Sequence, residues 1–344
     1  MRLFHNDYNE LCHPKILEKI QSVVSLQMNG YGEDAICASA ANHIRECCDA
    51  PNASVHFLSG GTQTNLTVIA AALRPHQAVI AAETAHVNVH ETGSIEATGH
   101  KVIALKSNDG KITAEQIRQT VDEHWNDSTH EHIAQPKLVY ISHPTELGTT
   151  YTHAELFEIH QICKDRGLLL FVDGARLGYA LAAKDNDISL SDLAKLTDVF
   201  YIGGTKVGAM LGEAVVITNP VIAEDFRYII KQRGGMLAKG WLLGVQFDTL
   251  FTDNLYIEIA ANANMLADRI RAALACAGYP LAYSGTSNQI FAIIPDSTLA
   301  EIGKEFSYSF WGKTDKDHSV VRFCTSWATK KEDVDALCEK IKSL

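Results

Sequence analysis

Short, almost wholly apolar runs alternate along this chain with longer stretches in which apolar residues recur every three or four positions. The short runs are rich in β-branched residues and predict buried strands, whereas the longer stretches predict amphipathic helices. We expect strands at residues 54–58, 78–82, 101–105, 137–142, 168–173, 198–203 and 213–218. This alternation is typical of an α/β fold with a mostly parallel, seven-stranded sheet covered on both faces.

One pair of these strands departs from the alternation. Only a short, glycine-containing connection separates Lys206 from Glu213. It is too short for the crossover helix that joins parallel strands. We therefore expect the last two strands of the sheet to be antiparallel neighbours.

After residue 218 the pattern becomes mainly helical. Helices are expected at 221–232, 240–251 and 255–277, then strands at 283–294 and 319–325 and a closing helix at 331–344. We divide the chain into a large domain, residues 1–250, that includes an N-terminal arm, and a smaller α+β domain, residues 251–344. Because no Pro- or Gly-rich linker marks the join, a long helix is expected to run through it.

Composition narrows the range of partners. Hydrophobic residues make up 46% of the 344 residues, and the formal net charge is -11 with a pI of about 5.7. Such an acidic chain is not expected to bind nucleic acid or an anionic membrane. No signal peptide or membrane-spanning run is apparent. The eight cysteines are scattered without a CxxC pair, which favours reduced thiols and a cytoplasmic location.

Lys206 is the first candidate for chemistry. It follows an apolar, β-rich run and stands in the glycine-rich turn Gly203-Gly204-Thr205-Lys206. Burial beside a core strand lowers the pKa of an amine and makes it a nucleophile able to form a Schiff base. A surface lysine in a flexible turn is the alternative interpretation of this stretch alone.

A second candidate lies where the strand at 54–58 leads into a helix, in the sequence SGGTQTN. The free N–H groups and the dipole of a helix N-terminus bind phosphate, while Gly60 and Gly61 allow close approach and Thr62 offers a hydroxyl. A plain strand-to-helix turn is the alternative. The motif is neither GxGxxG nor a P-loop, which argues against a nicotinamide-dependent oxidoreductase.

Two further strand ends carry residues suited to a flat, nitrogen-containing ring. Asp173 ends a predicted strand, where open α/β sheets bind ligands, and a carboxylate there keeps a pyridine nitrogen protonated. Arg176 is placed to bind a carboxylate, and His86 to stack on a ring or relay a proton. A helix-capping Asp with an exposed Arg, and a polar helix start, are the alternatives. A metal site with His90 and Glu91 is not expected.

Together these four features appear in the order that pyridoxal 5'-phosphate requires. They are a phosphate cup, a ring-stacking histidine, an aspartate for the ring nitrogen and a Schiff-base lysine, each near a strand end. The sequence therefore predicts pyridoxal 5'-phosphate as the cofactor.

The chain resembles the L-threonine aldolase and β-eliminating lyase family in the motifs SGGTQTN, AHVNVHETG, VDGARLG, GGTKVG and VRFCTSW. These are fold-type-I pyridoxal-phosphate enzymes. The resemblance runs over nearly the whole chain, from NDY at residue 6 to TSWAT near residue 329. It implies the fold of a fold-type-I, pyridoxal-phosphate-dependent transferase.

The resemblance also implies roles for individual residues. Lys206 is implied to form the Schiff base, Asp173 to contact the pyridine nitrogen and His86 to stack on the ring. The implied phosphate ligands are Gly60, Gly61 and Thr62, joined by Lys231 or Arg233 from a basic, glycine-rich loop, across a dimer interface. The implied ligands of the substrate α-carboxylate are Arg176, which also borders the cofactor, and Arg322, with Tyr31 near the active site.

Two residues depart from the family pattern. Glu146, in HPTELG, takes the place of a histidine that contacts the substrate hydroxyl, and Asn6 takes the place of a serine. A carboxylate acts as a general base when burial raises its pKa. We therefore expect Glu146, His86 or an ordered water to accept the proton of the substrate hydroxyl, and Asn6 to retain the carboxylate contact.

The activity implied by the resemblance is that of a carbon–carbon lyase. A low-specificity L-threonine aldolase cleaves L-threonine or L-allo-threonine to glycine and acetaldehyde, in a homodimer or homotetramer with active sites at subunit interfaces. β-Elimination, racemisation and transamination of another amino acid are alternatives that keep the cofactor. A non-catalytic binding protein on the same fold is a further alternative.

Overall fold

The central sheet of the protein has seven strands. The computed structural model describes all 344 residues. The strands follow the order β2-β8-β7-β6-β5-β3-β4. They are β2 Ser54–Leu58, β3 Gln77–Ala82, β4 Lys101–Leu105, β5 Gln135–Ser142, β6 Leu169–Asp173, β7 Val199–Gly203 and β8 Glu213–Ile217. All seven predicted strands are present close to their expected bounds, and the predicted fold class is confirmed.

Strand β8 is the one antiparallel member of this sheet. It pairs antiparallel with both β2 and β7, whereas the remaining neighbours pair parallel. The short connection between β7 and β8 leaves no room for a crossover helix, so the predicted antiparallel pair is confirmed. As a result, the first residue of β8 lies at the same edge of the sheet as the last residues of β2 and β7.

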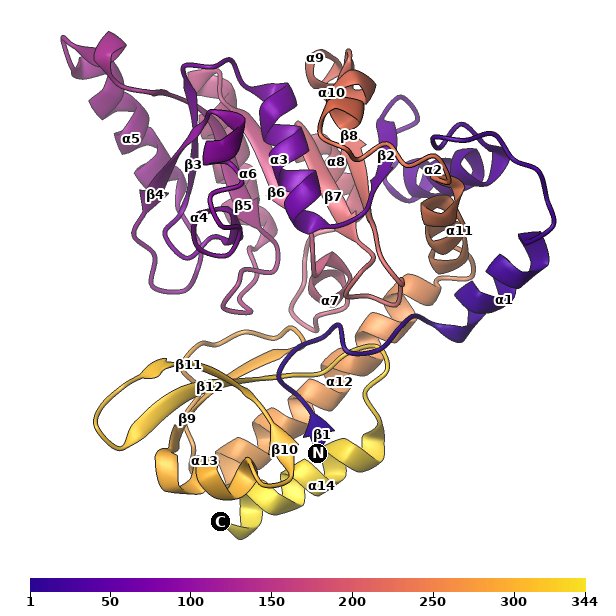
Figure 1. Cartoon of the computed structure of the whole chain (residues 1–344). Helices are drawn as coiled ribbons and strands as arrows, with labels where there is room; N and C mark the ends of the chain where they lie inside the picture. The colour runs from indigo at the N-terminus through magenta and orange to yellow at the C-terminus, as the bar shows by residue number, and fades with distance from the viewer.

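Helices cover both faces of the sheet (Figure 1). As a result, every residue of β3, β7 and β8 is buried. Asp34 caps α2 by accepting hydrogen bonds from the N–H groups of Ile36 and Cys37. The helices of this part are α1 Pro14–Val23, α2 Ala35–Cys47, α3 Gly61–Ala72, α4 His86–Val89, α5 Ala114–Asn126, α6 His153–Arg166, α7 Leu177–Leu181, α8 Leu190–Leu196, α9 Pro220–Ala223, α10 Phe226–Gln232 and α11 Trp241–Leu250.

A smaller α+β unit lies below the large sheet in Figure 1, and both chain ends lie in it. Its three-stranded sheet has the order β11-β12-β9, and the short strands β1 and β10 pair beside it. Its elements are β1 Arg2–Leu3, α12 Leu255–Cys276, β9 Gln289–Pro295, α13 Asp296–Ile302, β10 Phe306–Ser307, β11 Ser309–Lys313, β12 His318–Cys324 and α14 Lys331–Ser343. Two 3-10 turns, Glu96–Thr98 and His130–His132, complete the assignment.

The long helix α12 runs from one unit to the other (Figure 1). Its first half, with Tyr256 and Ile259, belongs to the core around the large sheet, and its second half, with Leu266 and Ile270, to the smaller core. The N-terminal arm also joins the smaller core through Phe4. The division at residue 250 stays a prediction. None of the helices is long and apolar enough to cross a membrane.

Two predicted elements differ from the structure. The expected helix over 221–232 is divided into α9 and α10, because Asp225 adopts a left-handed backbone conformation with φ of 58°. The expected strand over 283–294 forms only from Gln289 onward.

Candidate active site

A cavity of about 330 Å³ lies where several strands of the large sheet end. Its wall includes Gly60, Thr62, Glu146, Asp173 and Lys206. Since β2, β5, β6 and β7 all end at this edge, residues that follow different strands meet here. A second cavity of about 300 Å³ shares several of these residues and extends to the smaller sheet, with Trp311 and Arg322 in its wall.

The lysine turn is partly buried, and two tyrosines hydrogen-bond to its backbone. The hydroxyl of Tyr179 donates to the carbonyl of Lys206, and the hydroxyl of Tyr256 donates to that of Gly203 at 2.8 Å. Burial lowers the pKa of Lys206, and the positive charge of Arg176 lowers it further, against the opposing effect of nearby carboxyl groups. The predicted desolvated amine is therefore present, poised as a nucleophile.

Asp173 is buried at the end of β6 among hydrogen-bond donors. The Tyr140 hydroxyl and the Asn65 side-chain amide donate to its Oδ2, the latter at 3.1 Å, and the N–H of Ala175 donates to Oδ1 at 2.9 Å. Burial alone would raise the pKa of Asp173, but the charge of His86 and the Tyr140 hydrogen bond outweigh it and lower the pKa. Asp173 is therefore an anion suited to a protonated ring nitrogen.

A polar chain connects Asp173 to His86. His86 Nδ1 lies 2.7 Å from Glu91 Oε1, which also accepts a hydrogen bond of 2.7 Å from Asn65. Asn65 donates to Asp173 from the same nitrogen. Glu91 thus fixes the orientation of the His86 ring at the cavity wall.

Glu146 is held by two hydrogen bonds to one of its oxygens. Ser142 Oγ donates to Oε1 at 2.6 Å, and the backbone N–H of His86 donates to the same oxygen at 2.9 Å. Burial raises the pKa of Glu146, and the Ser142 hydrogen bond opposes this rise. Glu146 therefore combines a fixed position with the raised pKa of a general base.

The two predicted carboxylate-binding arginines differ in their partners. Arg176 donates from Nε and from a terminal nitrogen to Asp7, at 2.7 and 3.0 Å. Arg322 has no acidic partner: it donates to the Gln289 side chain and the His5 carbonyl, and its Nε is buried without a partner. Of the two, Arg322 is the one left free to bind an anion.

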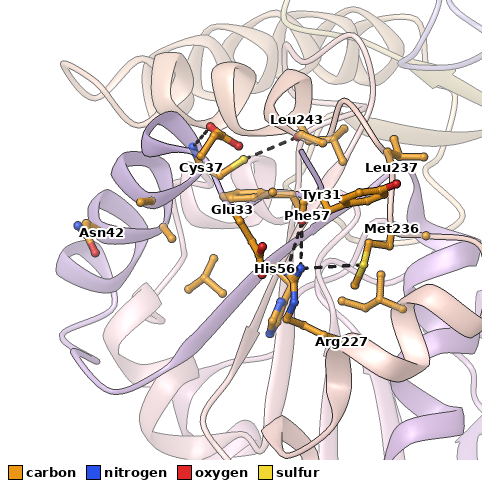
Figure 2. Close-up of a pocket in the computed structure, with 18 of the residues that line it drawn as sticks. Tyr31, Glu33, Cys37, Asn42, His56, Phe57, Arg227, Met236, Leu237 and Leu243 are labelled. Carbon is orange, nitrogen blue, oxygen red and sulfur yellow. Dashed lines mark hydrogen bonds and ion pairs between the residues drawn. The ribbon is translucent and has the colours of Figure 1, made fainter. Parts of the chain in front are cut away.

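Some predicted site residues lie away from this cavity. The side-chain oxygen of Asn6 accepts from the N–H of Tyr8 within its own turn, whereas the neighbouring Asp7 reaches Arg176. Tyr31 lines a separate cavity of about 360 Å³, and Arg233 lines none of the three. Figure 2 shows that separate cavity, where the ring of Tyr31 lies beside Leu237. Their predicted contacts with ligands stay predictions.

Sequence reasoning missed Asp7, Asn65, Tyr140, Trp311 and Glu213. Tyr140 carries a local signal, because it is a polar-tipped aromatic residue inside the apolar run of β5, the strand next to β6. Asp7 stands beside Asn6 in the recognised NDY motif. The other three acquire their place only through contacts between distant segments.

The cavity fits pyridoxal 5'-phosphate, the predicted cofactor. A Cβ added to Gly61 would lie 3.1 Å from the Tyr201 hydroxyl, so only a glycine leaves this part of the cup clear. That hydroxyl is buried and has no hydrogen-bond partner. The N–H groups of the first turn of α3 have no partner within the helix. The cup, the buried amine and Asp173 together supply donors for a phosphate, a nucleophile for an aldehyde and an anion for a ring nitrogen.

Comparison with known proteins connects this geometry to characterised relatives. The sequence model of a family described as "Beta-eliminating lyase" matches residues 15–292. A low specificity L-threonine aldolase of a Pseudomonas species, strain NCIMB 10558, is 30% identical over 345 residues, which cover 98% of this chain and 96% of that protein.

Solved structures with a similar fold include another threonine aldolase. A threonine aldolase structure from Leishmania major has 46% sequence identity and a TM-score of 0.97, and the match covers 100% of this chain and 99% of that one. An aspartate aminotransferase of Thermus thermophilus, at 14% identity, has a TM-score of 0.73 over 99% of this chain and 91% of that one, and shares the fold.

Proposed function

This chain belongs to the β-eliminating lyase family, and from that membership we propose that it is a pyridoxal-phosphate-dependent L-threonine aldolase. It cleaves the Cα–Cβ bond of β-hydroxy-α-amino acids, among them L-threonine and L-allo-threonine, to glycine and an aldehyde. One observation carries this proposal: Lys206, Asp173, the phosphate cup and a buried carboxyl group line one cavity.

The cofactor is pyridoxal 5'-phosphate, and its protonated ring, when bound, withdraws electrons from a bond broken at the substrate Cα. We propose that Lys206 anchors it, that Gly60, Gly61 and Thr62 hold its phosphate, and that His86 stacks on its ring. The negative charge of Asp173 favours the protonated ring nitrogen. Tyr140 and Asn65 keep Asp173 in place through their hydrogen bonds.

Arg322 is proposed to hold the substrate α-carboxylate. Its unpartnered Nε and its position in the cavity wall support this role. The Trp311 ring, 5.2 Å from the guanidinium carbon, covers one face of the side chain and restricts its movement. Arg176, also proposed to bind the carboxylate, is held by Asp7 and fixes the N-terminal arm over the cavity.

Glu146 is proposed to accept the proton of the substrate β-hydroxyl. Removal of that proton lets the hydroxyl oxygen form the carbonyl of the leaving aldehyde as the Cα–Cβ bond breaks, and a proton delivered to Cα then completes glycine. Burial and the hydrogen bonds from Ser142 and His86 support this role, since they position a carboxyl group with a raised pKa in both cavities. Hydrogen bonding to Glu91 leaves the other ring nitrogen of His86 available for relaying a proton.

A second copy of the chain is proposed to complete the site. Tyr31 is 45% exposed and Lys231 lies 4.8 Å above its ring, outside the active-site cavity of the same chain. We propose that Tyr31 and the loop with Arg233 face the active site of a partner in a homodimer or a homotetramer. The eight free cysteines support a cytoplasmic location.

Product analysis tests the proposed reaction. Purified protein, loaded with pyridoxal 5'-phosphate, is expected to release acetaldehyde and glycine in equal amounts from L-threonine or L-allo-threonine. Release of ammonia and a 2-oxo acid would instead identify a β-elimination. Absence of aldehyde from every β-hydroxy amino acid tried would overturn the aldolase proposal.

A further inference from the structure

Glu213 is a buried acidic residue in the wall of the phosphate-binding cavity. A carboxylate in that place is unexpected, because a phosphate is itself an anion and like charges repel strongly in a buried site. The proposed mechanism gives this residue no role. Its contacts indicate whether its carboxyl group is ionised or protonated.

Strand pairing fixes Glu213 beside the phosphate cup. As the first residue of β8, it lies opposite Leu58 of β2 on one side and Gly203 of β7 on the other. The chain enters the cup directly after Leu58 and the lysine turn directly after Gly203. Both ligand-binding segments therefore begin next to Glu213.

One oxygen of Glu213 is occupied by the lysine turn. The N–H of Gly204 donates to Oε2 at 3.0 Å, and this N–H lies 3.0 Å from the Gly212 carbonyl as well. Oε1 takes no part in a backbone hydrogen bond. Because Glu213 lines the same cavity as Gly60, Gly61 and Thr62, its carboxyl group borders the space in which the cup holds a phosphate.

The charges around Glu213 favour its neutral form. Burial raises the pKa of Glu213 to about 8, and Asp173 on β6 raises it too, whereas Lys206, Thr205 and the Gly204 N–H oppose the rise. The hydroxyls of Tyr201 on β7 and Tyr256 on α12 lie near enough to feel its charge and are uncharged, because burial raises the pKa of each. A bound phosphate would add a second nearby negative charge and stabilise the protonated acid further.

We propose that Glu213 binds the cofactor phosphate as a neutral carboxylic acid, donating an O–H hydrogen bond from Oε1 while Oε2 accepts from Gly204. Glu213 already carries this proton near neutral pH, and at a pH above its pKa the proton is taken up from solvent when the phosphate binds. This inference rests on pyridoxal 5'-phosphate as the cofactor. It adds Glu213 to the phosphate site beside the helix N-terminus and the hydroxyl of Thr62.

Because protonation of Glu213 and binding of the phosphate are coupled, the affinity for the cofactor depends on pH. If only the protonated acid accepts the phosphate, the dissociation constant rises roughly tenfold for each pH unit above the pKa of Glu213 in the free protein. A glutamine offers an amide N–H at the same place and does not titrate. Glu213→Gln therefore keeps the hydrogen bond and removes the part of the pH dependence that Glu213 causes.

The test measures binding of pyridoxamine 5'-phosphate, which carries the same ring and phosphate but cannot condense with Lys206. Its dissociation constant is measured by fluorescence titration from about pH 7 to about pH 10. In the wild-type protein we expect affinity to fall across this range, and in Glu213→Gln to match the wild type at pH 7 and fall less steeply above it. Glu258→Gln, an exposed substitution on α12, should follow the wild type.

A spectroscopic measurement on the wild-type protein covers the case in which Glu213→Gln does not fold. Isotope-edited infrared spectra should gain a protonated carboxyl band when pyridoxamine 5'-phosphate binds at pH 9, and calorimetry in buffers of different ionisation enthalpy should register proton uptake. Glu146 is the other carboxyl group with a raised pKa in this cavity. Persistence of the band in Glu146→Gln assigns it to Glu213, and its loss in Glu146→Gln would contradict the proposal.

Two results would overturn this inference while leaving the cofactor site in place. One is the same pH dependence of affinity in the wild type and in Glu213→Gln; the other is a loss of affinity at pH 7 in Glu213→Gln, since this would show that the carboxylate is the form required. Failure of the proposed aldolase activity would look different, because it concerns products and leaves binding of the phosphate compound intact. A protein that binds no pyridoxamine 5'-phosphate at any pH would overturn both the site and this inference.

Discussion

Two cavities of similar volume differ in what surrounds them. The active-site cavity, about 330 Å³, gathers charged residues that follow four strands. The cavity in Figure 2, about 360 Å³, lies beside α2 and is lined by residues such as Phe57, Met236 and Leu243 around His56. Burial lowers the pKa of His56 to about 4, so its ring is neutral. This second cavity also carries opposed charges, but its Arg227–Glu33 ion pair is exposed. Charges buried together, and not volume, therefore distinguish the reacting site.

The largest expected effect is that of Lys206→Ala. Without the amine, the cofactor loses its covalent anchor, and activity should fall by more than about a thousandfold. Borohydride should label the wild-type chain at Lys206 and leave the variant unlabelled. Lys316→Ala, an exposed substitution in the smaller unit, should retain activity and labelling. Full activity in Lys206→Ala would remove the distinction between the two cavities.

Glu146→Gln tests the proposed base in the same cavity. The amide cannot accept a proton, so kcat should fall roughly a hundredfold or more, while the absorbance of the bound cofactor persists. In the wild type, kcat should also decrease at low pH, where Glu146 becomes protonated. This decrease should be absent from the pH profile of the variant. Glu158→Gln on α6 is the matched exposed control. An unchanged kcat in Glu146→Gln would show that His86 or an ordered water, and not Glu146, accepts the hydroxyl proton.

Arg322→Ala tests the free cation of the active site. Loss of a charge-assisted hydrogen bond to the substrate carboxylate should raise KM roughly tenfold to a hundredfold, with a smaller change in kcat. The kinetic constants for L-threonine, compared with those of the exposed control Arg118→Ala, provide the measurement. An unaltered KM would leave Arg176 as the sole carboxylate ligand.

The smallest effect on activity is expected in the other cavity. His56→Gln should change kcat/KM by less than about twofold, because the residue lies outside the reacting site. In the wild type, His56 titrates near 6.5 when unfolded and about 4 when folded. The unfolded state therefore binds the proton first, and stability should fall by up to roughly 3 kcal/mol as pH drops from 6.5 to 4.

Denaturant unfolding at several pH values checks this contribution. The variant should lose that part of the pH dependence, so its stability relative to the wild type should improve as the solution becomes more acidic. Equal slopes for both proteins would contradict the proposed neutral, buried state of His56.

The fold was predictable to a large extent because its signals are local. Apolar runs identified the seven strands, and the short link after Lys206 identified β8 as antiparallel. The division between α9 and α10 was missed, since the backbone conformation of Asp225 is not evident from periodicity. Strand β11 was also missed because it is half exposed and gains its structure by pairing with β12.

The site was predictable only where one residue type at one strand end suggests its chemistry. Lys206, Asp173, His86 and the glycines of the cup are of this kind. Arg176 pairs with Asp7, which is 169 positions away in the sequence, and no local sequence pattern predicts such a pair. Glu213 could be recognised as a site residue only from the pairing of β8 with β2 and β7, which places it beside both the cup and the lysine turn.

The reversed strand β8 also bears on how the protein is made. A growing chain of 212 residues already contains the cup, Asp173 and Lys206, but β2 and β7 become joined only when β8 enters between them. The sheet edge that carries both the cup and the lysine turn is therefore complete only after residues 213–217 have been added. Cofactor capture belongs to the later stages of synthesis, and a fragment that ends before Glu213 should not retain it.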